Sequence, residues 1–366
     1  MRIAIDVRPL ASPLTGIGRY TDSLVRRLVR CNDHDWFLYS DRPLPTNPPA
    51  GRNVTIRTGD ARGGSPGSLR WAQWEYTRWA KQDRIDTFWS PRHHLPLLLP
   101  DSVKTVVTIH DLVWKRYPET MQRKNYWLER VLMGPSISRA DRVIAVSNFT
   151  AREIAHFFPL ASAKTTVIQE AAELPEGNPV LPGGLPDQFI LFVGTLEPRK
   201  NLELLLRAYA ETAPSGLPLV IAGGAGWGNV RIDNLVNELG LENQVTVLGY
   251  VSEQELQGLY SNASALVMPS HYEGFGLPAV EAMHHGLPCI VSRGTALEEI
   301  CDSAALLVDP TSRIQLSDAI KAICHEDTNA KLSRAAKARA SQFSWDLAAS
   351  ETLSILEAIA DTETSA

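Results

Sequence analysis

The nine residues from Glu273 to Glu281, Glu-Gly-Phe-Gly-Leu-Pro-Ala-Val-Glu, combine two carboxylates with two glycines and a proline. An apolar run at 265–269 comes just before them and predicts a buried strand. Pro278 suits the first position of a following helix, because proline lacks the N–H group that a helix start leaves unpaired. The stretch is therefore predicted to be a loop at the carboxyl end of a strand, leading into a helix.

This predicted loop has the features of a phosphate site. Gly274 and Gly276 let the backbone approach a ligand closely, and the N–H groups around 275–279 form a helix start that attracts anions. Glu273 precedes the loop and Glu281 is expected in the first helical turn, so two carboxylates flank one row of amide donors. Such an arrangement could hold hydroxyls on either side of the diphosphate of a nucleotide-sugar. An ordinary strand-to-helix turn with two surface glutamates is the alternative.

Cationic and imidazole side chains stand at the ends of two other predicted strands. Arg199 and Lys200 lie just before a predicted helix, so their charges and the helix dipole would act at one place; a solvated basic pair is the alternative. His110 and Asp111 follow a predicted strand at 105–108, at the edge where an open α/β sheet places ligand chemistry. A histidine that caps or bridges a crowded loop is the alternative there.

A second glycine-rich segment, at 15–20, contains Gly16 and Gly18 and follows the first predicted strand at 2–7. It imitates a dinucleotide-binding fingerprint. However, Gly16 lies well past the strand end, and the last position of the pattern is Thr21 rather than glycine. Nicotinamide binding is therefore not expected.

The acidic and histidine clusters of the sequence lack the spacing of a metal site. The Asp-His-Asp segment at 33–35 lies between a predicted helix and an inner strand, at the wrong end of the sheet for a ligand, and is assigned to a turn. The histidine pairs at 93–94 and 284–285, and His325, have no companion ligands. We therefore expect chemistry that requires no metal or other cofactor.

The chain as a whole alternates short β-rich runs with helical patterns, which predicts an α/β protein with parallel sheets. A length of 366 residues suggests two domains. A proline- and glycine-rich segment at 171–187 is the expected linker. We expect a first Rossmann-like domain at 1–175, a second at 186–345, and a C-terminal helix at 346–366 that returns to the first.

The strands are predicted at 2–7, 36–39, 87–90, 105–108, 142–146 and 164–170 in the first domain, and at 189–193, 217–222, 245–248, 265–269, 289–292 and 305–308 in the second. Residues 42–68 are rich in proline, glycine and arginine, and are predicted to be a surface excursion without regular structure. A long helical region is expected at 120–138.

Composition excludes several classes of protein. The net charge of −5 and a pI of about 6.0 argue against a surface that binds nucleic acid. The first residues predict a strand rather than a signal peptide, and no apolar run reaches about 18 residues. Four cysteines without Cys-x-x-Cys spacing are expected to be free thiols in a reducing cytoplasm.

In their order along the chain, these segments resemble the family 4 retaining glycosyltransferases of GT-B fold. The resemblance is greatest to the bacterial mannosyltransferases and rhamnosyltransferases that build O-antigens, lipopolysaccharide and exopolysaccharides. It covers nearly the whole chain, and the ordered set is specific although each segment alone is weak. The segments are 15–20, 109–112, 146–148, 194–201, the glutamates at 273 and 281, and 343–345.

The resemblance implies two Rossmann-like domains whose parallel sheets face a central cleft. It implies that Glu281 holds the ribose hydroxyls and that Arg199 and Lys200 neutralise the diphosphate, which makes these two cations the main catalytic groups. Gly16 and Gly18 would face the diphosphate from the opposite domain.

The transferred sugar has its own implied contacts, which are Glu273, His110 and the backbone amides of Gly274, Phe275, Gly276 and Leu277. The sequence departs from its relatives in two places. Thr195 stands where relatives often have arginine, and Glu170-Ala171 replaces the usual Asn-Gly after the last strand of the first domain. The phosphate clamp and one sugar contact are therefore expected to differ.

The activity implied by the resemblance is that of a retaining, metal-independent hexosyltransferase. The expected donor is GDP-mannose, and the expected acceptor is a lipid-linked saccharide in the biosynthesis of cell-surface polysaccharide. The enzyme would act in the cytoplasm, in peripheral contact with the inner face of the membrane, and would not bind nucleic acid. A UDP-sugar-dependent transferase, a sugar-nucleotide epimerase of the same architecture and a non-catalytic binding protein are the alternatives.

The predicted helix at 69–82 has two faces. Its core stripe is Leu69, Ala72, Tyr76, Trp79 and Ala80. Its other side is Trp71, Trp74, Arg70, Arg78 and Lys81. Aromatic rings beside cations predict a contact with anionic lipid headgroups. Packing of Trp71 and Trp74 under the 42–68 excursion is the alternative.

Overall fold

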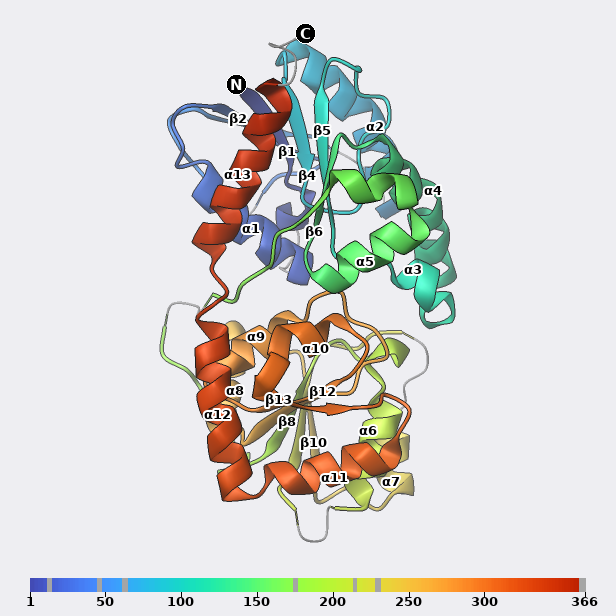
Figure 1. Cartoon of the computed structure of the whole chain (residues 1–366), viewed down its shortest axis with the longest axis vertical. Helices are drawn as coiled ribbons and strands as arrows, with labels where there is room; N and C mark the ends of the chain where they lie inside the picture. The colour runs from blue at the N-terminus through green and yellow to red at the C-terminus, as the bar shows by residue number, and fades with distance from the viewer. Residues whose placement is uncertain are drawn as a thin grey trace. The chain divides into compact units, whose positions relative to one another are not determined.

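The computed structural model describes residues 1–11, 15–44, 48–60, 65–173, 177–212, 216–227 and 232–361. The chain divides into two compact units. Unit 1 consists of Met1–Arg116, Arg123–Glu170 and Ser344–Ala366, and unit 2 consists of Tyr117–Gln122 and Ala171–Phe343. Each unit contains one parallel sheet with helices packed on it (Figure 1).

The sheet of unit 1 has seven strands in the order β3-β2-β1-β4-β5-β6-β7, and all neighbouring pairs are parallel. The strands are β1 (Arg2–Asp6), β2 (Asp35–Ser40), β3 (Val54–Thr58), β4 (Thr87–Ser90), β5 (Lys104–Ile109), β6 (Arg142–Ala145) and β7 (Thr165–Val167). The strand order reverses between β1 and β4. The carboxyl ends of β1 and β4 are therefore the place where an open α/β sheet is expected to bind a ligand.

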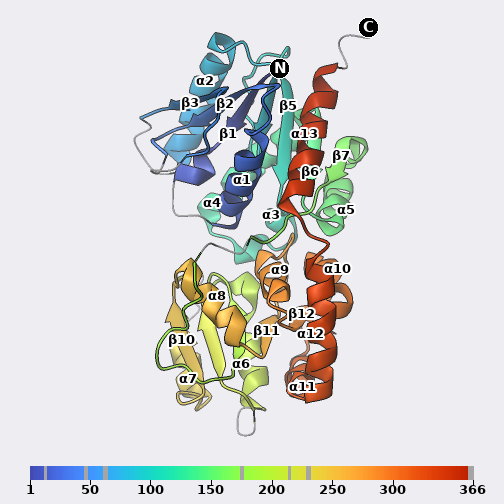
Figure 2. The same ribbon diagram turned by 90° about the vertical axis from the view of Figure 1, so that its left-hand side faces the viewer.

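Helices cover both faces of this sheet. They are α1 (Gly16–Leu28), α2 (Ser65–Gln82), α3 (Val113–Arg116), α4 (Arg123–Arg139), α5 (Asn148–Phe157) and α13 (Trp345–Asp361), with 3₁₀ helices at Arg8–Ala11 and Pro159–Lys164. The last helix, α13, packs against α1 and contacts β4 and β5, whereas α2 and α4 lie on the opposite side of the sheet (Figures 1 and 2).

The sheet of unit 2 has six parallel strands in the order β10-β9-β8-β11-β12-β13. The strands are β8 (Ile190–Val193), β9 (Leu219–Ala222), β10 (Val245–Gly249), β11 (Ala265–Met268), β12 (Cys289–Ser292) and β13 (Ala305–Val308). The helices are α6 (Leu202–Ala210), α7 (Ile232–Glu238), α8 (Glu253–Asn262), α9 (Leu277–His284), α10 (Ala296–Cys301), α11 (Arg313–Ile323) and α12 (Glu326–Ala340). Here the strand order reverses between β8 and β11, and 3₁₀ helices occur at Pro118–Thr120, Pro198–Lys200 and Asp302–Ala304.

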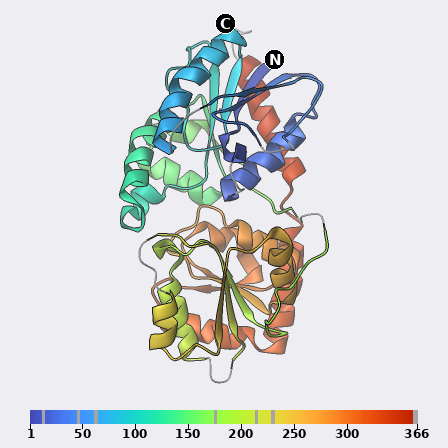
Figure 3. The same ribbon diagram turned by 180° about the vertical axis from the view of Figure 1, so that it is seen from behind.

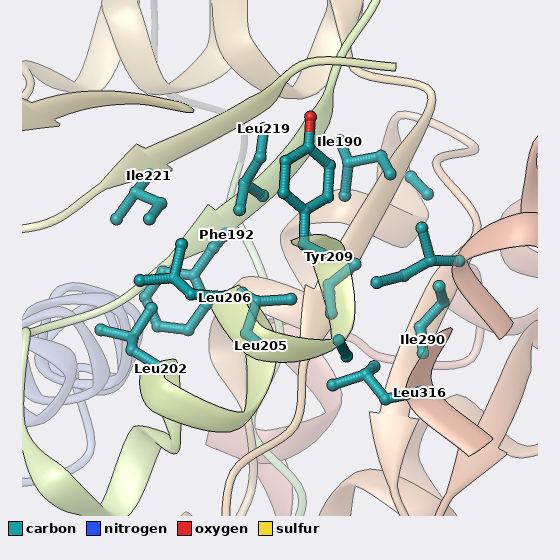
Figure 4. Close-up of a cluster of buried hydrophobic side chains, with 14 of the residues drawn as sticks. Ile190, Phe192, Leu202, Leu205, Leu206, Tyr209, Leu219, Ile221, Ile290 and Leu316 are labelled. Atoms are coloured by element: carbon teal, nitrogen blue, oxygen red, sulfur yellow. The ribbon is translucent and has the colours of Figure 1, made fainter. Parts of the chain in front are cut away.

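An apolar cluster holds one face of this sheet to its helices (Figure 4). Leu202, Leu205 and Leu206 of α6 pack on Ile190 and on its neighbours in the sheet. The leucines recur at helical spacing, so α6 presents one apolar side to the strands. This packing fixes where α6 begins, and with it the loop that carries Arg199 and Lys200.

Two expectations about local structure were wrong. Residues 42–68 contain strand β3 at Val54–Thr58. This is an edge strand that is mostly exposed, so it contains no apolar run for the sequence to reveal. The segment Tyr117–Gln122, expected within the first domain, belongs to unit 2, where Tyr117 stacks on His271.

Candidate active site

A largely buried cluster of two cations and two carboxylates lies where the strand order of unit 2 reverses. Lys200 Nζ donates to Glu273 Oε1 at 2.6 Å, and Arg199 Nη1 donates to Glu273 Oε2 at 2.9 Å. The hydroxyl of Ser270 also donates to Glu273 Oε1, at 2.7 Å. These groups follow β8 and β11, the two strands between which the sheet order reverses. The structure thus brings Glu273 together with the basic pair Arg199 and Lys200, which the sequence analysis had selected separately from it.

The fourth member of the cluster, Glu197, was not predicted. Its side chain is only 3% exposed, and its carboxylate accepts a hydrogen bond from Arg199 Nη2. Arg199 also donates to the carbonyl of Tyr272 at 2.7 Å, so acceptors on two loops fix its guanidinium. The sequence signal was a glutamate two residues before the basic pair, but that spacing alone does not reveal an ion pair.

Glu273 is ionised in this cluster. Burial by itself raises the pKa of a carboxyl group, but the charges of Arg199 and Lys200, with the hydrogen bonds from Lys200 and Ser270, lower the pKa of Glu273 to about 2. The formal charges of the two cations and the two carboxylates cancel. A diphosphate that arrives here would therefore meet fixed, partly compensated cations rather than mobile surface charges.

Two features bring the loops of this cluster close together. Asn201 adopts a left-handed conformation, with φ of 60°, and its amide donates to the carbonyls of Pro269 at 2.9 Å and Pro310 at 2.8 Å. Gly194 lies against Lys200, since a β-carbon at Gly194 would come within 3.4 Å of Lys200 Cε. The two hydrogen bonds of the Asn201 side chain, together with the close contact at Gly194, hold Lys200 at the end of β8.

The glycine loop leads into α9 as predicted, with small differences. Gly276 is the residue before the helix and has φ of 112°, and a β-carbon there would lie 2.3 Å from Leu297 Cδ2. Pro278 is the second helical residue rather than the first. The ring of Phe275 is buried and meets Phe343 edge-on, so this residue can offer a ligand its backbone rather than its ring.

Glu281 does not lie in the first turn of α9, as expected, but in the second. Its side chain is 5% exposed, and Tyr260 Oη donates to its Oε2 at 2.8 Å. The expectation failed because the helix begins one residue early, at Leu277. Tyr260 on α8 is a further partner that the sequence did not reveal.

His110 lies in unit 1, at the end of β5, and both of its ring nitrogens face acceptors. Nδ1 is 2.8 Å from Glu170 Oε1, and Nε2 is 2.9 Å from the carbonyl of Pro91. The backbone N–H of His110 donates to His93 Nε2, and the ring of Tyr20 packs edge-on against it at 4.7 Å. Partners on both ring nitrogens therefore fix the orientation of the His110 ring.

Glu170 was noticed in the sequence only as a departure from relatives. The structure gives it a partner 60 residues away in the chain, and its side chain is 4% exposed. Gly16 and Gly18, the other predicted residues of unit 1, are the first and third residues of α1. Gly16 is exposed and Gly18 is buried.

The histidine pair at 93–94 pairs with Glu129 of α4. His94 Nε2 lies 2.9 Å from Glu129 Oε2, and His93 Nδ1 lies 3.6 Å from the same atom. Burial would raise the pKa of Glu129, but the two histidines lower it well below its usual range. Within the described ranges, no group of three histidine, cysteine or acidic side chains is placed to hold a metal ion.

Comparison with known proteins places this chain in a family. The model for Glycosyl transferases group 1 matches residues 183–341, and the model for Glycosyltransferase Family 4 matches residues 14–173. O-antigen chain mannosyltransferase B of Escherichia coli is 30% identical over 383 residues, which cover 96% of this chain and 98% of that protein. This chain belongs to the family 4 glycosyltransferases.

Two further comparisons agree with this assignment. O-antigen chain mannosyltransferase RfbU of Salmonella typhimurium is 31% identical to this glycosyltransferase over 63% of either chain. The structure of sucrose-phosphate synthase from Thermosynechococcus elongatus matches the fold with a TM-score of 0.80, at 21% identity and over 98% of each chain. The fold of the glycosyltransferase is GT-B, with one parallel sheet of seven strands and one of six. Among its described helices, none has the length and apolarity needed to cross a membrane.

Proposed function

We propose that this glycosyltransferase moves mannose from GDP-mannose to a lipid-linked saccharide, with retention of configuration and without a metal ion, in the cytoplasmic steps of cell-surface polysaccharide synthesis. The buried Lys200–Glu273–Arg199 cluster is the observation that carries the proposal for the chemistry. The full-length similarity to a protein named as an O-antigen mannosyltransferase supports the choice of sugar.

The cluster suits the departure of a nucleoside diphosphate. In the proposed reaction, the bond between the sugar C1 and the diphosphate oxygen breaks, and a bond from the acceptor hydroxyl to C1 forms on the same face. The proton of that hydroxyl passes to the departing phosphate oxygen. Lys200 and Arg199, together with the N–H groups at the start of α9, would stabilise the negative charge that grows on the diphosphate.

Glu273 has a double role in this proposal. Lys200 carries three N–H donors, of which Glu273 Oε1 accepts one, so Lys200 can bind phosphate and keep its ion pair. Glu273 stays ionised because its pKa is lowered to about 2, and it can accept hydrogen bonds from the hydroxyls of the donor sugar. Glu281, fixed by Tyr260, would accept the ribose hydroxyls.

The donor is tested first by thermal shift, because a ligand that binds only the folded state raises its stability. We expect GDP and GDP-mannose to raise the melting temperature more than UDP, UDP-glucose or mannose at equal concentration. Tighter binding of UDP would overturn the choice of base. The panel is repeated with EDTA, and a GDP shift that depends on Mg²⁺ would overturn metal independence at the binding step.

The reaction is tested with GDP-mannose and a lipid-linked saccharide. We expect mannose transfer in the presence of EDTA, with an α-linked product by NMR, because the mannose of GDP-mannose is itself α-linked. A β-linked product would contradict retention. A change of the donor sugar in the absence of acceptor would identify an epimerase instead.

A further inference from the structure

His93 takes no direct part in the proposed reaction, but it contacts His110, a residue of the candidate site. It follows β4, its side chain is buried, and its Nε2 accepts the backbone N–H of His110 at 3.2 Å. The two imidazole rings lie 5.6 Å apart, centre to centre. His110 follows β5, which is the neighbour of β4 in the sheet. The hydrogen bond therefore joins the loops that leave two neighbouring strands.

This hydrogen bond requires a neutral His93. A backbone N–H can donate to Nε2 only while that nitrogen has a lone pair, so the ring proton of His93 is on Nδ1. Nδ1 lies 3.6 Å from Glu129 Oε2. Glu129 belongs to α4, the teal-green helix at the side of unit 1 in Figure 3. The neutral ring thus turns its N–H towards a carboxylate and its lone pair towards His110.

A second proton on His93 would break its contact with His110. The cationic ring carries an N–H on Nε2 as well as on Nδ1, so Nε2 would present a donor to the N–H of His110. His110 is buried too, and a buried N–H without an acceptor is unfavourable. The backbone at His110 would therefore move away from His93 when His93 becomes charged.

The carboxylates that face His93 favour this second proton. Burial by itself lowers the pKa of the His93 imidazole, but Glu129 on α4 and Asp111 after β5 raise it above its ordinary value, and the charge of Arg92 opposes them. The hydrogen bond from His110 and the attraction of the carboxylates thus act on His93 in opposite directions.

His94 is the other titratable neighbour of His93, and it contacts the same carboxylate. Its Nε2 lies 2.9 Å from Glu129 Oε2. Burial lowers the pKa of the His94 ring, so this ring stays neutral and donates from Nε2. Of the two adjacent histidines, His93 is therefore the one that takes up a proton first as the pH falls.

We propose that His93 is a positioning residue for His110, and that a proton on its Nε2 abolishes this role. Neutral His93 holds the backbone of His110, while Glu170 and the carbonyl of Pro91 contact its ring. Cationic His93 pairs with Glu129 and releases the backbone. The inference rests on the proposed function in one respect, which is that His110 is expected to contact the transferred sugar.

The coupling is tested first without substrate, by NMR of the full chain with isotope-labelled histidine. The amide signal of His110 is identified by its absence from His110→Asn. As the pH is lowered from about 9 to about 5, the His110 amide proton should move upfield, because it loses a hydrogen bond. The midpoint should equal that of the ring signals of His93. In Glu129→Gln it should fall by about one pH unit or more, because His93 loses the nearby carboxylate.

His93→Gln distinguishes this effect from titration of the His110 ring itself. The amide oxygen of glutamine can accept the same N–H, but the side chain does not titrate. The pH-dependent movement of the His110 amide should therefore disappear. A movement that persists in His93→Gln overturns the proposal, as does a His110 amide that does not move in the wild type.

Transfer of mannose from GDP-mannose then tests whether this positioning matters for the reaction. The value of kcat/KM should fall as the pH is lowered through the midpoint seen by NMR, because kcat/KM reports ionisations of the free enzyme. His93→Phe keeps a buried ring but offers no acceptor, and should lower kcat about tenfold or more. His93→Gln should retain most of kcat and lose the pH step. Equal losses of kcat in the two variants would show a structural role and overturn the proposal.

His94→Gln is the matched control, because it removes a buried imidazole beside Glu129 without removing the acceptor of the His110 N–H. It should keep the pH step in kcat/KM. The melting temperature of each variant is measured, and if His93→Phe does not fold, the wild-type pH profile and His93→Gln decide. Transfer without an ionisation at the NMR midpoint would overturn the positioning role. Absence of transfer at every pH would contradict the proposed function instead, whereas the NMR titration needs no substrate and still tests the coupling.

Discussion

At the scale of single residues, the sequence analysis identified the main charged side chains of the candidate site but not all of the residues that they contact. Glu273, Arg199 and Lys200 were each predicted from their position at a strand end or helix start. Glu197 and Glu170 were not, because the contacts of their side chains depend on how the chain folds around them. For Glu170 the partner is 60 residues away. Such contacts follow from tertiary packing and have no local pattern.

Lys200→Ala is expected to lower kcat by at least about a hundredfold with little change in the melting temperature, because a fixed cation stabilises charge that develops only in the transition state. Arg199 and Ser270 would still hold Glu273 in the variant. Steady-state kinetics with GDP-mannose, alongside Lys331→Ala as control, measure the effect. An increase in KM at unchanged kcat would contradict the catalytic role.

The variant Glu197→Gln tests whether Glu197 orients Arg199 for catalysis. The variant gains a net positive charge in the cluster, so GDP should bind as tightly as before or more tightly. Nevertheless, kcat should fall about tenfold or more, because the neutral amide of glutamine holds the Arg199 guanidinium less firmly than the carboxylate does. Calorimetric GDP titration and steady-state kinetics give the two numbers. A loss of GDP affinity together with normal kcat would show that Glu197 does not position Arg199.

Glu273 should also make stability depend on pH. Its pKa is about 2 in the folded protein against 4.5 for the ordinary side chain. The depressed pKa contributes stability above about pH 5, up to about 3 kcal/mol, which is lost as the pH falls from 5 towards 2. Urea unfolding of unit 2, compared between wild type and Glu273→Gln, should show a difference at pH 7 that narrows at pH 3. A constant difference, or an equal pH effect in the exposed-site control Glu351→Gln, would contradict this.

At the scale of elements, strands and helices with clear apolar patterns were predicted well, and those without them were not. Buried strands such as β12 contain an apolar run, here Cys-Ile-Val, and the sequence located β12 at its observed bounds, Cys289–Ser292. The edge strand β3 is exposed and was missed. Trp71 was misplaced because helical spacing gives the side of a helix but not the loop that covers it.

The start of α9 depends on Gly276. Gly276→Ala places a β-carbon at φ of 112° and 2.3 Å from Leu297, so we expect a loss of about 1–3 kcal/mol in unfolding free energy and weaker GDP binding. Gly183→Ala is the matched control, because a β-carbon there meets no atom within 4 Å. Urea unfolding and thermal shift with GDP give both quantities. If the two variants had equal unfolding free energies and bound GDP equally well, the loop at Gly276 would be able to accommodate a β-carbon.

At the scale of the whole molecule, α13 joins the end of the chain to unit 1. Asp346 pairs with Arg27 of α1 at 2.8 Å, Glu357 lies 2.8 Å from His34, and the ring of Trp345 packs edge-on against Tyr20. The Asp346–Arg27 ion pair is partly exposed and contributes little. The apolar side of α13 therefore supplies most of the attachment.

Trp345 tests this attachment. Its side chain is 4% exposed, whereas Leu347, two residues later on the same helix, is 53% exposed. Trp345→Ala should lower the unfolding free energy of unit 1 by about 3–5 kcal/mol, because it leaves a cavity between α13 and Tyr20. Leu347→Ala should change it by less than about 0.5 kcal/mol. Amide hydrogen exchange is the suitable measurement, since a chain with two units need not unfold in one step. Exchange should accelerate in α1 and α13 of the Trp345 variant and remain unchanged in the strands of unit 2, and equal acceleration in both units would show that α13 stabilises the chain as a whole.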